Sequence, residues 1–233
     1  MVKIAAGLGK NKNIIEAAAN IDFKVILTES EEELIEMLLN NKVDAAIRGS
    51  LSATKIWNIL RKNYGQKIYR ASILELNGHK FILAPVGTSE VKNIEDKLKI
   101  IELEVEFLLK LGIEPKIGVI SGTRPETIGI DPKIDYFIEE SVDLVNAVKN
   151  KFPIKEYILD DAINDNANII LAPDGISGNL IFRSLVFLGA TKSYGAISLG
   201  MDEIFIDTSR SQTVDGYERA LKFSYYLANL NCV

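Results

Sequence analysis

The residues between 168 and 221 constrain the fold more than any other stretch of the sequence. Residues 168–172 form a short apolar run bounded by turn residues, which is the pattern of a buried parallel strand. Gly178 and Asn179 then open an amphipathic helix that ends at Gly189. A second apolar strand at 204–207 is followed by a helix that begins near Thr213. Strands that alternate with helices in this way predict an α/β protein with parallel strands.

The loops after these two strands are candidates for binding an anion. Glycines that lead a strand into a helix N-terminus expose backbone N–H groups, and the helix dipole adds partial positive charge there. The loop after 204–207 also carries Ser209 and Arg210. Ligands of open α/β sheets bind beyond the carboxyl ends of the strands. Gly178, Asn179, Ser209 and Arg210 are therefore predicted to lie at a site for an anionic group, with phosphate favoured.

The N-terminal part of the chain repeats this pattern. Predicted strands at 3–6, 23–28 and 43–47 alternate with helices at 13–19 and 30–40 and one that runs to residue 60. Ser30 is predicted to cap the second helix, because Glu33 follows three residues later in a capping-box pattern. The third strand ends in Arg48, Gly49 and Ser50, and Thr54 follows shortly before the helix. A strand-end arginine that faces a cleft can bind phosphate through two parallel hydrogen bonds. The alternative is a solvated arginine, with Ser52 as the helix N-cap.

The middle of the chain supplies further predicted elements. They are a strand pair at 67–74 and 81–85 around an Asn-Gly turn, helices at 94–111 and 136–149, and strands at 116–120 and 154–159. Ser121 follows the strand at 116–120, and Asp161 follows the strand at 154–159. Asp161 has two open interpretations, a helix cap and a polar residue that lines a cleft.

Composition excludes several classes of partner. A net charge of −5 argues against a general nucleic-acid or anionic-membrane surface, and no apolar run approaches the roughly 20 residues that span a bilayer. The N-terminus reads as a strand and lacks the pattern of a signal peptide. The single cysteine, Cys232, permits no intrachain disulfide, so we expect a cytoplasmic protein. With one histidine and one cysteine, a His/Cys zinc site is excluded, and we expect no metal.

Three segments resemble phosphate acetyltransferases and phosphate butyryltransferases. Residues 173–185 resemble the family pattern P-D-x-x-x-G-N-x-x-x-K-x-L, residues 209–216 resemble S-R-x-x-S-x-x-D, and residues 111–121 resemble L-G-I-x-P-K-V-A-x-L-S. The loop at 48–54 is also similar to a glycine- and threonine-containing loop of that family. The resemblance implies an α/β fold of the isocitrate and isopropylmalate dehydrogenase type, also called phosphotransacetylase-like. Two lobes would enclose a cleft.

The resemblance also implies an organisation and a set of roles. We expect residues 1–79 with about 200–233 to form one lobe and residues 80–199 the other, and we expect a homodimer. Arg210, Ser209 and Asp215 would act in catalysis, with coenzyme A as a candidate cofactor. The residues expected to contact a small phosphorylated or anionic ligand in the cleft, from the resemblance or from their place after a strand, are Arg48, Gly49, Ser50, Thr54, Ser121, Asp161, Gly178 and Asn179.

Within that group the chain is most similar to the MtxX family, the methyltransferase-related subunit X proteins, also called methanogenesis marker protein 4. The short length, the loop Arg-Gly-Ser-Leu-Ser-Ala-Thr at 48–54 and the segment Ser-Gly-Thr-Arg-Pro-Glu at 121–126 carry this resemblance. It implies a transferase subunit with methyltransferase subunits as partners. The sequence itself shows no S-adenosylmethionine fingerprint and no cobalamin-type D-x-H-x-x-G motif.

One departure from the phosphotransacylase pattern leaves the activity open. The aspartate that helps deprotonate the coenzyme A thiol in those enzymes falls at Gly216, and Asp215 stands one residue earlier. On a helix, this displacement turns a side chain by roughly 100° about the axis. Three functions remain open. They are a transferase of the subunit X type, an acyl phosphate:coenzyme A transferase in which Asp215 or Asp161 replaces the base, and a non-catalytic subunit that binds a ligand.

Overall fold

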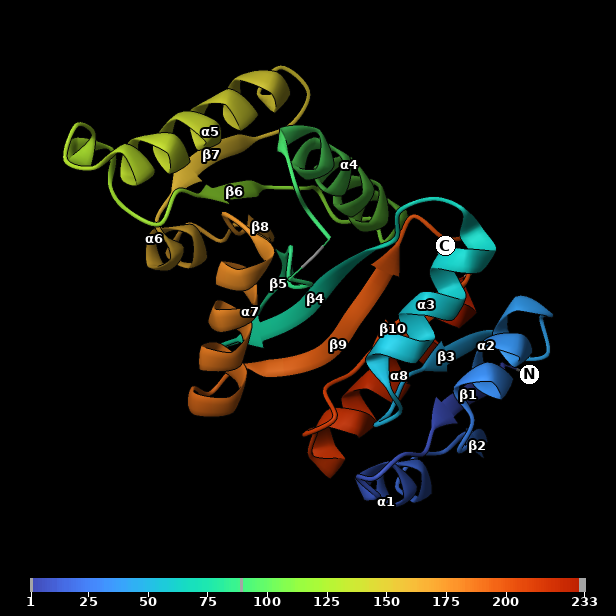
Figure 1. The fold of residues 1–233 in the computed structure, drawn as a ribbon. Coiled ribbons are helices and arrows are strands. Elements are labelled where there is room, and N and C mark those ends of the chain that lie inside the picture. Colours follow the sequence, from blue (N-terminus) through green and yellow to red (C-terminus); the bar gives the residue numbers. More distant parts are fainter. Residues whose placement is uncertain (1, 89, 231–233) are drawn as a thin grey trace. The chain divides into compact units, whose positions relative to one another are not determined.

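The structure, a computed structural model, describes residues 2–88 and 90–230. They divide into two compact units (Figure 1). Of the described residues, the first unit comprises 2–68 and 192–230, and the second comprises 69–88 and 90–191. The division expected from the sequence placed the crossings near 79 and 199. Strand β4 (Tyr69–Leu76) belongs to the second unit because it pairs along its length with β5 (His79–Ala84).

The first unit is built on five strands. Its strands run in the order β2 (Val25–Thr28), β1 (Ile4–Gly7), β3 (Ala45–Ile47), β10 (Ile204–Asp207) and β9 (Lys192–Leu199). The first four are parallel, and β9 is antiparallel to β10. Because β1, β3 and β10 are parallel neighbours, their carboxyl ends meet at one edge of the sheet, as the alternating strand and helix pattern predicts.

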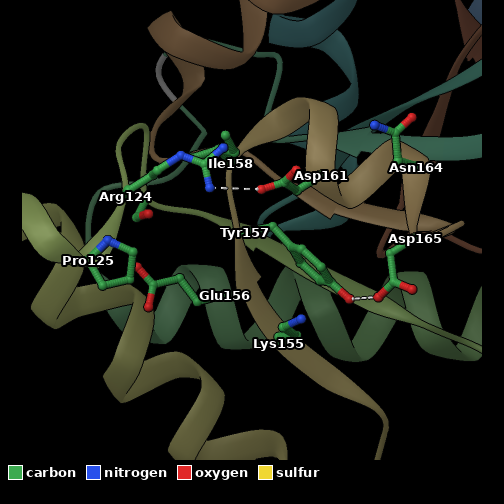
Figure 2. Close-up of a pocket in the computed structure, with 10 residues that line it drawn as sticks. Arg124, Pro125, Lys155, Glu156, Tyr157, Ile158, Asp161, Asn164 and Asp165 are labelled. Atoms are coloured by element: carbon green, nitrogen blue, oxygen red, sulfur yellow. Dashed lines mark hydrogen bonds and ion pairs between the residues drawn. The ribbon is translucent and has the colours of Figure 1, made fainter.

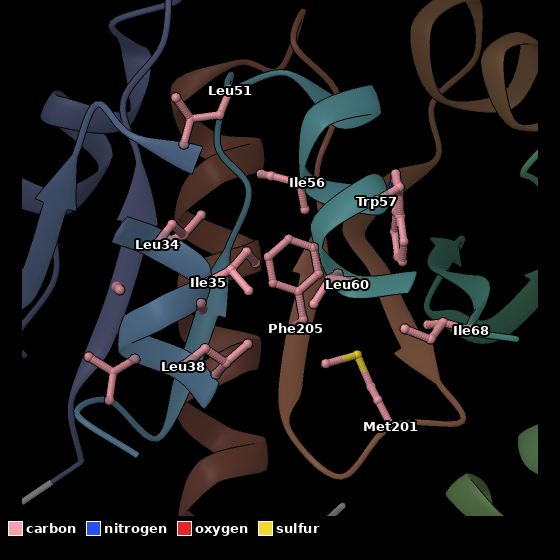
Figure 3. Packing of buried hydrophobic residues seen from close by; sticks show 13 residues of the cluster. Leu34, Ile35, Leu38, Leu51, Ile56, Trp57, Leu60, Ile68, Met201 and Phe205 are labelled. Carbon is pink, nitrogen blue, oxygen red and sulfur yellow. The ribbon is translucent and has the colours of Figure 1, made fainter. Parts of the chain in front are cut away.

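Side chains along these strands point alternately to the two faces of the sheet. This alternation determines which helices pack on each face. Ala5 and Phe205 lie in register with Ala46, and all three pack in one buried cluster with α2 (Glu31–Leu39) and α3 (Ala53–Tyr64). Figure 3 shows the Phe205 ring among leucine and isoleucine side chains of this cluster, and Trp57 meets the ring edge-on at 6.0 Å. The remaining helices of this unit are α1 (Asn13–Ala19) and α8 (Val214–Leu230), which pack on each other.

Two helix starts in the first unit follow the predicted capping chemistry. The Ser30 hydroxyl accepts a hydrogen bond from the Glu33 N–H at 3.1 Å and caps α2. The Ser52 hydroxyl accepts one from the Lys55 N–H at 3.4 Å and caps α3. Helix α3 continues four residues past the predicted end and stops at Gly65, whose φ of 63° is the left-handed conformation that glycine adopts most easily.

The second unit holds the other five strands, in the order β4, β5, β8 (Ile169–Leu171), β6 (Ile117–Ile120) and β7 (Ile154–Tyr157). Strands β4 and β5 form the predicted hairpin, with positive φ at Asn77 and Gly78. Strands β5, β8, β6 and β7 are parallel. The helices are α4 (Ile94–Lys110), α5 (Pro132–Val148), α6 (Leu159–Asn164) and α7 (Gly175–Arg183), with a 3-10 turn at Pro125–Thr127 and a π-helical turn at Ser184–Leu188.

The predicted start of α7 at Gly178 is wrong. The helix begins at Gly175, because the Asp174 carboxylate accepts hydrogen bonds from the Ile176 and Ser177 N–H groups at 2.8 and 2.7 Å. The Gly178 N–H is already inside the helix and donates to the Asp174 carbonyl at 2.9 Å. Asp174 therefore uses the N–H groups that the sequence analysis assigned to an anion.

Two other boundaries in the second unit differ from the prediction. Helix α5 begins at Pro132 rather than near 136, because Asp131 caps it and proline suits its first position. The predicted strand at 154–159 ends at Tyr157, and the short helix α6, which the sequence analysis did not predict, follows directly. Among the described residues, no helix combines the length and apolar character that a membrane crossing requires.

Candidate functional site

The first unit has a pocket at the edge where its parallel strands end. The loops after β1, β3 and β10 meet there, and they enclose about 860 Å³. Residues that line it are Leu8, Gly9, Lys10, Asn11, Lys12, Glu29, Glu31, Ser50, Leu51, Ser52, Lys55 and Arg210. We call it the strand-end pocket. Ligands of open α/β sheets bind at this position, and the volume is that of an ordinary small-molecule site.

Hydrogen bonds between loops fix the wall of the strand-end pocket. The Ser50 hydroxyl accepts from the N–H groups of Gly9 and Asn11, both at 3.1 Å, and donates to the Asn11 carbonyl at 2.9 Å. The Asn11 amide donates to the carbonyl oxygens of Arg210 and Gln212 at 3.1 and 2.9 Å. These hydrogen bonds therefore hold the backbone at Arg210 in place, while the Arg210 side chain is exposed.

The lining of the strand-end pocket carries an excess of positive charge. It contains four basic side chains, of Lys10, Lys12, Lys55 and Arg210, and two acidic ones, of Glu29 and Glu31. Lys12 lies 3.5 Å from Glu29, and Lys55 lies 3.5 Å from Glu31. Within residues 2–88 and 90–230, no ion pair engages Lys10 or Arg210. These two cations face the pocket without a compensating carboxylate.

Glu31 is the more buried of the two acidic groups, and it is held in its ionised form. Burial acts to raise its pKa, but the hydrogen bond from the Ser52 N–H, at 3.0 Å, and the Lys55 ammonium outweigh that effect and leave the pKa lowered. A general base is most effective when its pKa is near the operating pH. Glu31 is therefore poorly suited to remove a proton from a thiol.

Arg48 does not line the strand-end pocket. Its side chain is buried and forms an ion pair with Asp207, and its guanidinium also donates to the carbonyl oxygens of Thr208 and of Leu51, the latter at 2.7 Å. The Trp57 indole N–H donates to the second Asp207 oxygen at 3.3 Å. Arg48 thus joins the loop after β3 to the loop after β10. The alternative of a solvated arginine is wrong, while Ser52 does cap α3.

The remaining predicted residues of this unit occupy different positions. Gly49 has a φ of +61°, and a Cβ there would lie 1.7 Å from the Gly7 carbonyl oxygen, so the close approach of two loops requires glycine. Thr54 is an exposed residue in the first turn of α3 and lies outside the pocket lining. The Ser209 hydroxyl accepts from the Ser211 N–H at 3.2 Å, and the Ser209 carbonyl accepts from the Tyr217 hydroxyl, also at 3.2 Å.

The first turn of α8 shows what replaces the family aspartate. Asp215 is exposed and does not line the strand-end pocket. Gly216 is buried, and a Cβ on it would lie 2.1 Å from Oε1 of Gln212, whose side chain fills the adjacent space. Gln212 is 4% exposed, and its Oε1 accepts from the Thr213 N–H at 3.1 Å. An amide therefore occupies the space next to the position where the phosphotransacylase pattern has a carboxylate.

A second pocket, of about 430 Å³, lies within the second unit at the ends of β6 and β7 (Figure 2). It brings together two predicted residues, Ser121 and Asp161. The Ser121 hydroxyl donates to the Thr123 carbonyl at 2.8 Å, and Asp161 lies 3.3 Å from Arg124. Asp161 is the third residue of α6, so it is not the helix cap.

The far side of this second pocket is formed by Tyr157 and Asp165. The Tyr157 hydroxyl donates to the Asp165 carboxylate, as Figure 2 shows, and Lys116 lies 3.0 Å from the same carboxylate. Burial, followed by the hydrogen bond to Asp165 and the charge of that carboxylate, raises the pKa of Tyr157 to about 12. The hydrogen bonds from Tyr157 and Lys116 lower the pKa of Asp165. This pocket carries charges of both signs and no excess of positive charge in its lining.

Gly178 and Asn179 lie outside both pocket linings. A Cβ on Gly178 would lie 1.9 Å from the Pro85 carbonyl oxygen, so glycine here lets α7 pack closely on the chain after β5. The Asn179 amide donates to the Val86 carbonyl at 3.3 Å. Both residues thus hold α7 in place within the second unit.

Several residues of the strand-end pocket were missed by the sequence analysis. Lys10, Asn11 and Lys55 are the main ones, and Gln212 is the residue that explains Gly216. The segment Gly7-Leu8-Gly9-Lys10, a tight turn after a predicted strand, was the available signal for Lys10. In the described part of the chain, no group of three or more His, Cys, Asp or Glu side chains is arranged to hold a metal ion.

Comparison with known proteins gives relatives that match 96% of this chain. No family model matches the sequence. A protein of Methanosarcina barkeri named "Putative methyltransferase mtx subunit X" is 39% identical over 96% of this chain and 83% of its own length. An uncharacterized methyltransferase of Methanocaldococcus jannaschii is 38% identical over 96% of this chain and 97% of its own length.

Solved structures of lower sequence identity share the fold. A branched-chain phosphotransacylase from Enterococcus faecalis superimposes with a TM-score of 0.75 at 16% identity, covering 98% of this chain and 99% of the other. A β-decarboxylating dehydrogenase from Thermococcus kodakarensis superimposes with a TM-score of 0.51 at 15% identity, covering 93% of this chain and 76% of the other. The predicted phosphotransacetylase-like fold, shared with this class of dehydrogenase, is confirmed.

Proposed function

This chain belongs to the methyltransferase mtx subunit X family, and we propose that it binds a phosphorylated or otherwise anionic small molecule in the strand-end pocket, as a subunit of a methyl-transfer system. The observation that carries the proposal is the exposed Arg210 guanidinium, which has a fixed backbone and no carboxylate partner within the described residues. The word methyltransferase comes from the relatives' names. The ligand proposal comes from the pocket.

The chemistry of arginine supports an oxyanion as the ligand. A guanidinium offers a planar set of N–H donors that match two oxygens of a phosphate or carboxylate. A hydrogen bond to a charged group contributes roughly 1.5–3 kcal/mol. Because Asn11 holds the Arg210 carbonyl, the loop need not be reorganised when a ligand binds, which limits the entropy lost on binding.

Isothermal titration calorimetry with inorganic phosphate tests this proposal. We expect Arg210→Gln to weaken phosphate binding by about tenfold or more, since one charge-assisted contact is lost. The matched control is Arg61→Gln, which removes an arginine from the last turn of α3, away from the pocket lining. Equal affinities of the wild type and the Arg210 variant, or no phosphate binding by the wild type, would contradict the proposal.

Acyl transfer between an acyl phosphate and coenzyme A is the second candidate. The Ser209-Arg210 pair and the shared fold favour it. The carboxylates do not, because Glu31 has a lowered pKa and Asp215 lies outside the pocket lining. We therefore place ligand binding first. We further propose a homodimer that associates with methyltransferase subunits, which light scattering and co-purification can test.

A further inference from the structure

Among the described residues, two cations rather than one face the strand-end pocket without an ion-pair partner. Arg210 comes from the loop after β10 and Lys10 from the loop after β1, and both line the same pocket. The other two lysines of the lining, Lys12 and Lys55, each have a glutamate partner at 3.5 Å. A single phosphate on Arg210 would leave the Lys10 charge without a partner.

Hydrogen bonds connect the loops that carry these two cations. Asn11, the residue after Lys10, donates through its side-chain amide to the Arg210 carbonyl at 3.1 Å and to the Gln212 carbonyl at 2.9 Å. Asn13 donates to the same Gln212 carbonyl at 3.0 Å. The backbone positions of Lys10 and Arg210 are therefore coupled, and both residues line the same pocket.

We propose that the strand-end pocket takes a ligand with two linked phosphate groups, a diphosphate, of which Arg210 binds one and Lys10 the other. This inference rests on the proposed binding of an anion at Arg210 and specifies the class of ligand. The pocket volume of about 860 Å³ is far larger than one phosphate requires and leaves room for an organic group attached to the diphosphate.

The experiment compares inorganic phosphate with inorganic pyrophosphate by isothermal titration calorimetry, without divalent cations and at one ionic strength, since salt screens exposed charges. We expect pyrophosphate to bind the wild type about tenfold more tightly than phosphate, because it gains a second charge-assisted contact. In Lys10→Gln this preference should fall to about twofold or less, with phosphate affinity changed by about threefold or less.

The matched control is Lys12→Gln, which removes one lysine charge from the same lining but leaves Lys10 in place. A general attraction of pyrophosphate to positive charge would make the Lys10 and Lys12 variants lose the preference equally. That result would contradict the inference.

The other outcomes separate the two proposals. Phosphate binding that depends on Arg210, with no preference for pyrophosphate, overturns the diphosphate inference and leaves the proposed function standing. If neither anion binds, the proposed function fails, and the diphosphate inference fails with it. A preference for pyrophosphate that persists in Lys10→Gln assigns the second contact to another group and also overturns the inference.

Discussion

At the scale of single residues, the same residue type has opposite roles in neighbouring loops of this protein. Arg210 and Arg48 both follow a strand, and both were predicted to bind an anion. Arg210 is exposed at the strand-end pocket, whereas Arg48 is buried against Asp207. The sequence could not separate them, because the partner of Arg48 lies 159 residues away along the chain.

The buried Arg48–Asp207 ion pair leads to a prediction about the stability of the fold. Arg48→Met should lower the free energy of unfolding by about 3–5 kcal/mol, because it removes the guanidinium that pairs with the buried Asp207 carboxylate. The double variant Arg48→Met/Asp207→Leu should recover much of that loss, since no buried charge remains. Urea denaturation measures both, with Arg61→Met as the exposed control. A loss below about 1 kcal/mol in the single variant, as for an exposed pair, would show that the pair is not the buried link between the two loops.

The contact between Gln212 and Gly216 predicts the cost in stability of a side chain at position 216. A side chain at 216 must displace the buried Gln212 amide, whose Oε1 would lie 2.1 Å from a new Cβ. Gly216→Asp should therefore cost roughly 1–3 kcal/mol. In the Gln212→Ala background the same change should cost less, with a coupling of at least about 0.5 kcal/mol. Identical costs in the two backgrounds, measured by thermal denaturation, would mean that Gln212 does not fill this space.

At the scale of helices and strands, local chemistry predicted most of the fold. The serine caps of α2 and α3, the Asn-Gly turn between β4 and β5 and the apolar runs of the strands are short-range signals, and each appears where it was expected. Two of the misses occur at helix starts that a side chain caps earlier than predicted. Asp174 caps α7 three residues earlier than the glycine pattern suggested, and Asp131 with Pro132 does the same for α5.

Helix α4 contains a buried acid, Glu104, from which we predict how the free energy of unfolding depends on pH. Glu104 is completely buried, and neither carboxyl oxygen has a hydrogen-bond partner among the described residues, so burial raises its pKa well above 4.5. The folded state therefore holds this proton to higher pH than the unfolded state does. Above about pH 4.5 the free energy of unfolding should fall as pH rises, by roughly 1.4 kcal/mol per unit from this group until the folded pKa is reached.

Glu104→Gln tests that prediction. The variant should have a higher melting temperature than the wild type at pH 8, and the difference should shrink toward pH 4.5, below which the wild-type carboxyl is protonated in both states. Glu102→Gln, an exposed neighbour on α4 that pairs with Lys99 at 3.4 Å, is the control and should show little pH-dependent difference. A melting-temperature difference for Glu104→Gln that does not vary with pH would contradict the assignment.

At the scale of the whole molecule, the site depends on topology that the sequence shows only in part. The parallel order of β1, β3 and β10 brings together loops that are up to 200 residues apart, as in the hydrogen bond from Asn11 to the Arg210 carbonyl, which spans 199 positions. Strand ends and motif resemblance predicted Arg210, Ser50, Ser121 and Asp161 as site residues, and each of them lines a pocket. These signals could not show that Lys10 joins Arg210, or that Ser121 and Asp161 line a separate pocket within the second unit.

The shared fold with phosphotransacylases leads to an activity prediction for the whole protein. With acetyl phosphate and coenzyme A, turnover should be about 10²–10⁴-fold below the ordinary enzyme value of about 10 s⁻¹, because general-base assistance is missing. The double variant Gln212→Ala/Gly216→Asp, which makes room for a carboxylate, should gain activity. Wild-type turnover near 10 s⁻¹ would instead establish acyl transfer as the function.

The central claim is that an oxyanion binds to Arg210 in the strand-end pocket. A crystal of the protein soaked in tungstate, a tetrahedral oxyanion with a strong anomalous signal, tests it most directly. We expect the anomalous peak in the strand-end pocket, within hydrogen-bond distance of the Arg210 guanidinium, and no such peak in crystals of Arg210→Gln. A peak found only at Arg124 in the second unit, or a peak in the strand-end pocket that persists without Arg210, would contradict the claim.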